Sequence, residues 1–165
     1  MILVVMGVCG CGKTTIGEAL ASSLGWPFFD ADDFHPEGNV AKMASGQPLT
    51  DDDRWPWLDG IAEEMQRVLA RGGHAVLACS ALKEAYRSRL QRAGDVRMVY
   101  LKGDQATIAA RLAERHHKYM PASLLPSQFA ALEEPADALV VDIRQSIAAQ
   151  VQYIRDGFAL VASSR

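Results

Sequence analysis

The sequence has few cysteines, few aromatic residues and no large excess of charge of either sign. Its 165 residues include three cysteines, Cys9, Cys11 and Cys79, which cannot all pair and do not have the spacing of a zinc site. Lys and Arg total 17 against 20 Asp and Glu, and the basic residues are scattered, so we do not expect nucleic acid as a partner. Unpaired cysteines fit a reducing compartment, and we expect a cytoplasmic protein.

Long apolar runs and low-complexity segments are also missing. No apolar stretch is long enough to span a bilayer, so we expect no membrane partner. The apolar start at Met1 lacks the basic region of a signal peptide, and we expect a core strand there. Because 49% of the residues are hydrophobic and no linker or repeat interrupts the chain, we predict a single soluble domain over residues 1–165.

One motif is far more specific than this ordinary composition. Gly7–Thr14 reads GVCGCGKT, which fills every fixed position of a GxxxxGKT phosphate loop. The apolar run Ile2–Met6 directly precedes it and a helical pattern over Lys13–Leu24 follows, which is the order of strand, loop and helix that such a loop needs. We therefore predict a nucleotide-binding protein.

Each residue type in this loop has a task in holding a polyphosphate. Gly7, Gly10 and Gly12 permit positive φ angles and close approach of the backbone, so that successive amides can face the phosphates. Lys13 offsets phosphate charge, and the Thr14 hydroxyl offers an oxygen ligand to Mg²⁺. The expected ligand is therefore ATP with Mg²⁺.

Two of the cysteines lie inside the loop. A thiol near a helix N-terminus tends to have a lowered pKa, so oxidation of Cys9 or Cys11 could regulate nucleotide binding. The alternative is that both cysteines serve only as small residues of the loop. The sequence leaves both interpretations open.

Five short apolar segments alternate with helical patterns along the chain, which is typical of a parallel sheet with helices on both faces. The expected strands are Ile2–Met6, Pro27–Phe29, Ala75–Cys79, Val96–Leu101 and Leu139–Val141. The expected helices are Lys13–Leu24, Trp57–Ala70, Lys83–Arg92, Gln105–Glu114, Pro121–Leu132 and Ile147–Arg155. Because ligands collect at the carboxyl ends of parallel strands, we expect the chemistry in the segments that follow them.

Carboxylates gather after the second expected strand, in Asp30–Pro36. One of them can hold a water of the Mg²⁺ shell while another accepts the proton of an attacking hydroxyl. We assign the metal role to Asp30 and the acceptor role to Asp32. The alternative is a cluster that caps a helix, which is the task we expect of Asp33. For His35 neither a functional nor a structural role is favoured.

Two arginines are candidates for binding an anionic acceptor. Thr50–Asp53 has the pattern of an N-cap with an acidic first turn. Arg54 beside these acids could present a rigid guanidinium to a substrate carboxylate, or form only a salt bridge. After the third expected strand, Lys83 and Arg87 stand four residues apart on one helix face, and Arg87 is either a substrate contact or part of an exposed basic face.

A short basic and aromatic segment joins two expected helices in Arg111–Pro121. Cations there could close over the transferred phosphate and keep water away from it, as a kinase lid does. We expect this lid at about residues 115–122. The adjacent His116 and His117 could instead suggest a metal site, but neighbouring side chains diverge on a helix and no further ligand has suitable spacing.

With these segments the chain resembles the bacterial gluconate kinases of the thermoresistant type, which are relatives of shikimate kinase among the P-loop kinases. The resemblance covers nearly the whole chain, and its second block is far more specific than the phosphate loop. The blocks are GVCGCGKT (Gly7–Thr14), HPEGNVAKMASGQPLTDDDRWPWL (His35–Leu58), CSALKEAYR (Cys79–Arg87), YLKGD (Tyr100–Asp104), SQFAALEEP (Ser127–Pro135) and VVDI (Val140–Ile143).

The resemblance implies both a fold and an activity. The fold is the P-loop kinase fold, an α/β fold with a five-stranded parallel sheet, helices on both faces and a small lid. The activity is ATP- and Mg²⁺-dependent phosphorylation of the 6-hydroxyl of D-gluconate, which gives 6-phospho-D-gluconate for sugar catabolism. The scaffold that it implies is a homodimer.

The resemblance also implies roles for individual residues. Asp32 and His35 line the acceptor pocket, and Arg54 and Arg87 hold the sugar acid. The nucleotide is held by Gly7, Gly10, Cys11, Gly12, Lys13, Thr14, Thr15 and Arg111, where Arg111 covers the adenine opposite the segment after Asp142. Thr14 and Asp30 serve the metal, and catalysis rests on Lys13, Asp32 and Arg115, where Arg115 is the lid arginine.

The chain departs from the family pattern at two places. Cys9 and Cys11 stand where serines are usual, which leaves the backbone cradle intact. In the lid, Lys118 and Tyr119 stand where the family often has His and Phe. We therefore assign no lid-histidine role to His116 or His117.

Two other functions remain open. A kinase for a different small hydroxy acid such as shikimate, or for a nucleotide, would share the site and differ only in the acceptor pocket. A nucleotide-dependent switch or assembly ATPase would use the γ-phosphate to order a loop. A GTPase switch would need an AsnLysxAsp guanine motif, and the sequence has none.

Overall fold

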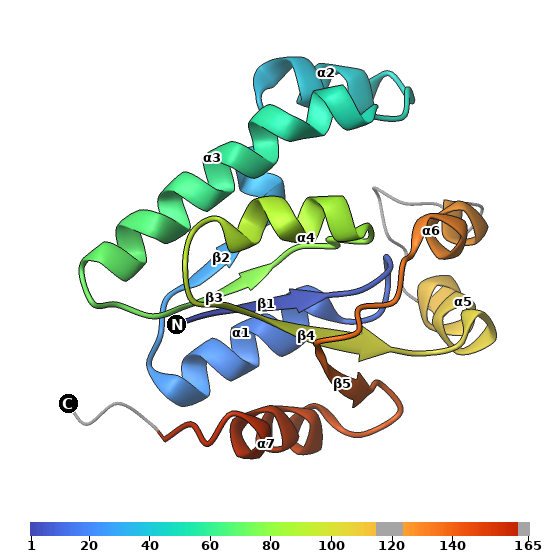
Figure 1. The fold of residues 1–165 in the computed structure, drawn as a ribbon. Coiled ribbons are helices and arrows are strands. Elements are labelled where there is room, and N and C mark those ends of the chain that lie inside the picture. The colour runs from blue at the N-terminus through green and yellow to red at the C-terminus, as the bar shows by residue number, and fades with distance from the viewer. Residues whose placement is uncertain (115–123, 162–165) are drawn as a thin grey trace.

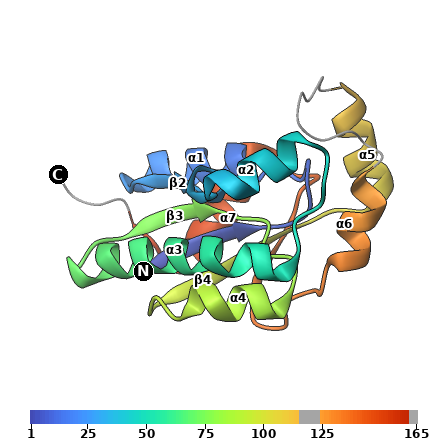
Figure 2. The same cartoon turned by 90° about the horizontal axis from the view of Figure 1, so that it is seen from above.

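A parallel sheet lies at the centre of the computed structural model, which describes residues 1–114 and 124–161. Within these residues five strands run in the order β2-β3-β1-β4-β5, and every pairing is parallel. Helices cover both faces of the sheet (Figure 1), as the view from above also shows (Figure 2). The predicted α/β architecture is confirmed.

The chain alternates strands with helices throughout the described residues. The strands are β1 (Ile2–Met6), β2 (Phe28–Asp30), β3 (Ala75–Ala78), β4 (Val96–Lys102) and β5 (Leu139–Asp142). The helices are α1 (Lys13–Leu24), the short 3₁₀ helix η1 (Ala31–Phe34), α2 (Glu37–Ala44), α3 (Asp51–Ala70), α4 (Glu84–Gln91), α5 (Gln105–Glu114), α6 (Leu125–Ala131) and α7 (Ile147–Gly157).

Strand β1 is the middle strand and pairs with β3 on one side and β4 on the other. Its last residues, Val5 and Met6, pair with Ala78 at the end of β3 and with Tyr100 near the end of β4. The phosphate loop starts at the next residue, so it leaves the middle of the carboxyl edge. The segments that follow the other strands flank it on both sides.

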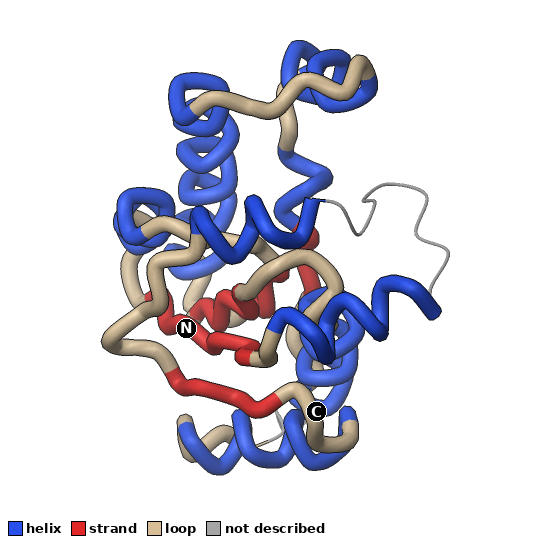
Figure 3. Tube along the Cα trace, turned by 90° about the vertical axis from the view of Figure 1, so that its right-hand side faces the viewer, coloured by secondary structure: helices blue, strands red, loops and turns tan. Residues whose placement is uncertain are grey.

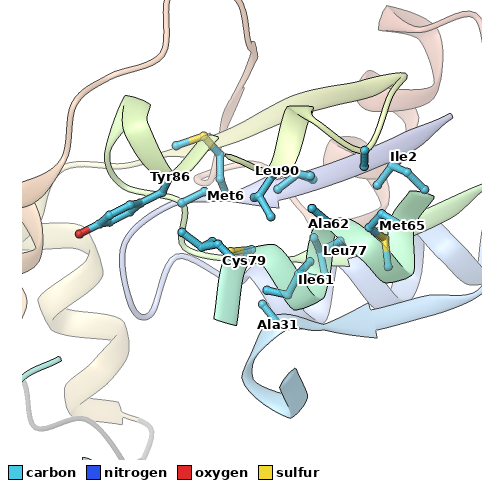
Figure 4. Close-up of a cluster of buried hydrophobic side chains, with 14 of the residues drawn as sticks. Ile2, Met6, Ala31, Ile61, Ala62, Met65, Leu77, Cys79, Tyr86 and Leu90 are labelled. Carbon is cyan, nitrogen blue, oxygen red and sulfur yellow. The ribbon is translucent and has the colours of Figure 1, made fainter. Parts of the chain in front are cut away.

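Alternate residues of β1 face opposite sides of the sheet and belong to two separate cores. Ile2 and Met6 pack in the core under α3 and α4, whereas Leu3 and Val5 pack against α1 and α7, and all four side chains are fully buried. Burial of a side chain of this size stabilises the fold by about 1.5–3 kcal/mol. Figure 4 shows the first core, with Ile2 at one end and Tyr86 at the other.

Most predicted helices form close to their expected bounds, and α1 and α5 begin and end where predicted. Helix α3 starts at Asp51, six residues before the expected Trp57. Pro56 lies inside the helix. The capping box favours the earlier start, because Asp53 N–H donates to Thr50 Oγ1 at 3.1 Å and Thr50 N–H donates to Asp53 Oδ2 at 2.8 Å.

Two further helices, η1 and α2, form the segment between β2 and α3 and were not predicted from the sequence. The prediction that Asp33 caps a helix is wrong. The N-cap of η1 is Asp30, whose carboxylate accepts from Asp32 N–H at 2.9 Å, and α2 follows Pro36 without a side-chain cap. A signal for α2 was present, because proline is common at helix starts and Gly46, with a φ of +81°, follows its end.

Helices α5 and α6 pack together at one end of the sheet (Figure 1), and Figure 3 looks onto this end. The predicted lid, residues 115–122, lies between them and outside the described residues. In the described part of the chain, no helix has both the length and the apolar character needed to cross a membrane.

Candidate active site

The phosphate loop has a backbone that only glycine fits at two positions. Gly7, Gly10 and Gly12 have φ angles of +150°, +81° and +101°. A Cβ atom on Gly7 would lie 2.6 Å from the Cys11 Sγ, and one on Gly10 would lie 2.7 Å from the Leu112 side chain. The loop is therefore packed tightly against itself and against α5, as the predicted close approach of the backbone requires.

Three of the loop amides are already engaged within the protein, and the first, Gly7 N–H, donates to the Ser80 carbonyl at 3.3 Å. Cys9 N–H donates to the Gln128 side-chain oxygen of α6 at 3.1 Å, and Cys11 N–H donates to the Val8 carbonyl at 3.3 Å. The Lys13 ammonium donates to the same Val8 carbonyl at 3.1 Å, so its side chain folds back over the loop. The first turn of α1 carries no acid, which leaves its positive end free to attract an anion.

The surroundings of Cys9 and Cys11 favour the interpretation that both are small structural residues of the loop and not redox-sensitive thiols. Burial raises the pKa of Cys9 and of Cys11, and the nearby charge of Lys13 offsets only part of this effect. Cys79, at the end of β3, is fully enclosed, and burial raises its pKa to about 12. Thiols with raised pKa values hold little thiolate at neutral pH and react slowly with oxidants.

Asp30 and Thr14 meet at the end of β2, as the predicted metal site requires. The Thr14 hydroxyl donates to Asp30 Oδ2 at 3.4 Å, while Asp30 Oδ1 is occupied by its capping bond. One carboxylate and one hydroxyl suit Mg²⁺, which prefers oxygen ligands and takes its remaining ligands from water and substrate phosphates. Accordingly, the described residues contain no cluster of three or more His, Cys, Asp or Glu that could hold a metal by itself.

Asp32 and His35 lie beyond this pair, on η1 and at its end. The protein around Asp32 desolvates its carboxylate and raises its pKa, and the charge of Asp30 adds to the effect. The His35 ring stacks on Trp57 with 4.2 Å between centroids, and burial lowers its pKa. Trp57 in turn donates to the Ala31 carbonyl at 2.7 Å, so α3 fixes the position of η1.

Asn39 is a site residue that the sequence analysis missed. Its side chain is buried and donates to the Asp53 carbonyl at 2.9 Å, with the His35 Nδ1 atom 3.4 Å away. Asp53 also binds Lys42 at 2.6 Å. Helix α2 thus holds both the first turn of α3 and the histidine.

Arg54 lies among charged and aromatic groups at the start of α3. Its guanidinium donates to the Leu49 carbonyl at 2.8 Å and lies 3.7 Å from Asp51 and 5.4 Å from the centre of the Tyr86 ring. Lys83, just before α4, lies over the same ring and 3.6 Å from Asp51. Arg54 forms a salt bridge with Asp51, and part of its side chain stays exposed. Both predicted alternatives, a salt bridge alone and a contact with a substrate carboxylate, therefore stay open.

Arg87 is buried and binds the backbone. Its guanidinium donates to the carbonyls of Ala81 and Leu82 at 2.8 and 3.0 Å and to that of Glu133 at 2.8 Å. Ala81 has a φ of +45°, so this arginine stabilises a strained loop after β3. The alternative of an exposed basic face is wrong, and direct contact with substrate stays a prediction.

Arg111 lies on α5 and donates to the Ile143 carbonyl at 2.6 Å. This bond brings α5 and the segment after β5 together, the two elements expected to enclose adenine. The predicted lid arginine, Arg115, lies outside the described residues. Gln128, which binds the loop amide of Cys9, was in a family block but had no assigned role.

A separate pocket of about 370 Å³ lies between α4, the start of β4 and the segment before β5. Among the predicted site residues that the structure describes, only Arg87 lines it. The pocket is therefore distinct from the phosphate loop.

Comparison with known proteins agrees with this geometry. A family model described as shikimate kinase matches residues 9–153. Together with the parallel sheet and the phosphate loop, this match defines the chain as a P-loop kinase of the shikimate kinase-like class.

Individual relatives indicate which family of P-loop kinases the chain belongs to. The gluconokinase of Gluconobacter oxydans (strain 621H) is 51% identical over 138 residues, which cover 82% of this chain and 76% of that protein. The thermoresistant gluconokinase of Escherichia coli (strain K12) is 38% identical over 165 residues and 94% of each chain. The crystal structure of a gluconokinase from Sinorhizobium meliloti 1021 has a TM-score of 0.84 and 42% identity, and the match covers 95% of this chain and 90% of that one. The chain belongs to the gluconokinase family.

Proposed function

We propose that the protein transfers the γ-phosphoryl group of ATP to the 6-hydroxyl of D-gluconate and releases ADP and 6-phospho-D-gluconate. The observation that carries this proposal is the adjacency of two sites at one edge of the sheet. A phosphate loop with a tightly packed glycine backbone lies near a carboxylate, Asp32, whose pKa the charge of Lys13 affects. The Gly7 amide donates to the Ser80 carbonyl in the loop that leads to Lys83, and Lys83 and Arg54 are partly exposed cations beside Asp51. We infer gluconate as the substrate because the relatives are gluconokinases.

The nucleotide end rests on residues of the loop and of α5. Gly7, Gly10, Cys11, Gly12, Lys13, Thr14 and Thr15 hold the phosphates, and Arg111 covers the adenine. Thr14 and Asp30 hold Mg²⁺, which supplies charge neutralisation at the phosphates when it is bound. Lys13 moves from the Val8 carbonyl to the phosphates, because an anion attracts the ammonium more strongly than a carbonyl does.

The acceptor end rests on residues of η1, α3 and α4. Asp32 orients the 6-hydroxyl and accepts its proton as the phosphoryl group is transferred. A raised pKa makes this carboxylate a stronger base than an ordinary aspartate. His35 lines the pocket, Arg54 and Arg87 hold the sugar acid, and Arg87 also fixes the loop after β3.

Exclusion of water is the remaining requirement, since water competes with the acceptor for the phosphoryl group. We assign it to the segment of residues 115–122, with Arg115 stabilising charge on the transferred group. The chain acts as a single kinase domain, in the cytoplasm and as a homodimer.

The test is ADP release from ATP and Mg²⁺ with D-gluconate, D-glycerate, shikimate, AMP or no acceptor. Strong stimulation by gluconate alone supports the proposal, with the product identified as 6-phospho-D-gluconate by mass spectrometry and NMR. Stimulation by another acceptor instead would retain the phosphate chemistry but remove gluconate. Hydrolysis that no acceptor changes would remove the kinase function and favour a nucleotide-dependent switch.

A further inference from the structure

Helices α3 and α4 are joined by two clusters that each contain an acid and an aromatic ring. In the first, the Asp59 cluster, Arg89 donates to both oxygens of Asp59 at 2.9 and 3.0 Å. The same guanidinium lies over the Trp55 ring, 4.7 Å from its centroid. One cation meets one acid at hydrogen-bond distance, so the charges balance.

The second cluster, the Asp51 cluster, has two cations for one acid. Arg54 and Lys83 lie 3.7 and 3.6 Å from the Asp51 carboxylate, and both lie over the Tyr86 ring. The carboxylate also accepts a hydrogen bond from the Tyr86 hydroxyl, which points away from the core in Figure 4. Because both ion pairs are long and share one acid, the cluster keeps an excess of positive charge.

Neighbouring acids do not remove this excess. Asp53 is paired with Lys42 at 2.6 Å. Asp52 is exposed and takes part in none of the ion pairs found in residues 1–114 and 124–161. The side chains of Arg54 and Lys83 are 29% and 38% exposed, so a ligand can reach both.

The Asp51 cluster continues the acceptor side of the active site. Gly7 N–H donates to the Ser80 carbonyl at 3.3 Å, which holds the loop that leads to Lys83 beside the phosphate loop. From the other side, burial and then the charge of Arg54 lower the pKa of His35, while Asp32 opposes them. Asn39 provides a direct structural link, because its side chain lies 3.4 Å from His35 Nδ1 and donates to the carbonyl of Asp53, the residue before Arg54.

We propose that Lys83 acts with Arg54 to bind the carboxylate of the acceptor, and that this cation pair selects an acid over a neutral sugar alcohol. This inference rests on the proposed function, in which the reacting hydroxyl lies at Asp32. D-Gluconate carries its carboxylate at the opposite end of the carbon chain from the 6-hydroxyl. In the proposed arrangement the carboxylate lies between Arg54 and Lys83, where it takes up the charge that Asp51 leaves unbalanced, and the 6-hydroxyl end of the same chain lies at Asp32.

The test compares Lys83→Met, which removes the charge and keeps the length, with Lys83→Arg, which restores a cation. Arg89→Met is the matched control, because it also removes a cation over an aromatic ring, from the helix that follows Lys83 but in a balanced cluster. Steady-state kinetics are measured for D-gluconate and ATP. D-Glucitol, the neutral analogue, is added as a competitor, and thermal unfolding checks that each variant is folded.

In Lys83→Met we expect the KM for gluconate to rise about 10-fold, from the loss of one hydrogen bond to a charged group at a partly exposed site. The kcat and the KM for ATP should change by less than about 3-fold, and inhibition by glucitol should be unchanged. Lys83→Arg should recover most of the affinity, and Arg89→Met should behave like the unmodified protein. An unchanged gluconate KM in Lys83→Met, or an equal rise in Arg89→Met, would overturn the inference.

Failure of the proposed function gives a different result. If the unmodified protein phosphorylates D-glycerate or shikimate and not gluconate, the proposed substrate is wrong, and the KM of Lys83→Met for that acid then tests the cation pair. A rise supports the inference and no change overturns it. If no acid is phosphorylated, both proposals are overturned.

Discussion

Asp30 and Asp32 are two residues apart, yet the two carboxylates have different surroundings. Asp30 accepts hydrogen bonds from Asp32 N–H and from the Thr14 hydroxyl, which fix its orientation. Asp32 has no such bond to Thr14, and desolvation, together with the charge of Asp30, raises the pKa of its carboxyl. The two aspartates therefore differ in hydrogen bonding and in pKa, although they are close in the sequence.

Asp32→Asn should lower turnover by about 10² to 10⁴-fold, because the amide has the same shape but cannot accept the proton of the hydroxyl. Nucleotide affinity should stay nearly unchanged, since the phosphate loop is intact. Steady-state kinetics and calorimetric titration with a non-hydrolysable ATP analogue measure the two quantities. A variant with undiminished turnover would exclude Asp32 from catalysis.

Gly10→Ala should lower the free energy of unfolding by about 2 kcal/mol or more and weaken ATP binding. The new methyl group would require a strained φ and would clash with Leu112 at 2.7 Å. Gly60→Ala is the matched control, because Gly60 lies within α3 with no neighbouring atom within 4 Å of the new position. This control should stabilise the protein by about 0.5–1 kcal/mol. Urea unfolding measures the free energy of unfolding of the two variants, and titration with ATP measures their affinity for the nucleotide.

The first turn of α3 is the element on which the acceptor side depends. Thr50 and Asp53 cap each other, Lys42 binds the Asp53 carboxylate, and Asn39 holds the Asp53 carbonyl. The contacts with Lys42 and Thr50 lower the pKa of Asp53 from its ordinary value to about 2, the Lys42 bond most of all. The ionised carboxylate therefore contributes two of the contacts at this helix start, the ion pair with Lys42 and the hydrogen bond from Thr50 N–H.

Asp53→Asn should remove stability in a pH-dependent way. Because the folded-state pKa of Asp53 lies below its ordinary value, the ionised group stabilises the fold above about pH 4, and this contribution disappears as the pH falls toward about 2. The difference in free energy of unfolding between the unmodified protein and the variant should thus be largest near neutral pH. Urea unfolding at pH 7, 4 and 3 measures it.

Asp52→Asn is the control for this prediction, since it removes a charge from the same turn without touching the capping box. A loss of stability that is equal in the two variants, or equal at every pH, would contradict the assigned role of Asp53.

At the scale of the whole molecule, the active edge is assembled from segments far apart in the chain. The sheet brings the phosphate loop, η1 and the loop after β3 together, and Arg111 binds the segment after β5. Helix α6 also contacts the phosphate loop, because the side-chain oxygen of Gln128 accepts a hydrogen bond from the Cys9 amide, 119 residues away in the sequence. The helices on either side of residues 115–123 therefore both contact the phosphate loop.

Gln128→Ala should raise the KM for ATP by roughly 2- to 10-fold, the value of one ordinary hydrogen bond, because the Cys9 amide loses the acceptor that orients the loop. The KM for gluconate should change little, and so should global stability. Ser127→Ala is the control, because the Ser127 hydroxyl donates to the nearby Leu124 carbonyl and, among residues 1–114 and 124–161, to no atom of the phosphate loop. Equal effects in the two variants would assign the change to α6 and not to the contact with the loop.

Much of the fold and part of the site could be predicted from the sequence. The strand positions, the phosphate loop, the cap at Thr50 and the pairing of Asp30 with Thr14 all depend on patterns within a few residues or on the position of a segment at a strand end. Helix α2 was missed because it is short, and α3 was expected to begin only at Trp57 although the N-cap pattern at Thr50 was recognised.

The sequence by itself determined the class of the protein, since a phosphate loop between a buried strand and a helix needs only neighbouring residues to specify it. Only the tertiary structure decided which side chains are free to bind. In the folded protein, Arg87 binds backbone carbonyls and Gln128 binds the Cys9 amide. Asp51 forms ion pairs with two cations, Arg54 and Lys83. Such contacts join residues that are distant in the chain, and they depend on how helices pack over the sheet, which no local pattern records.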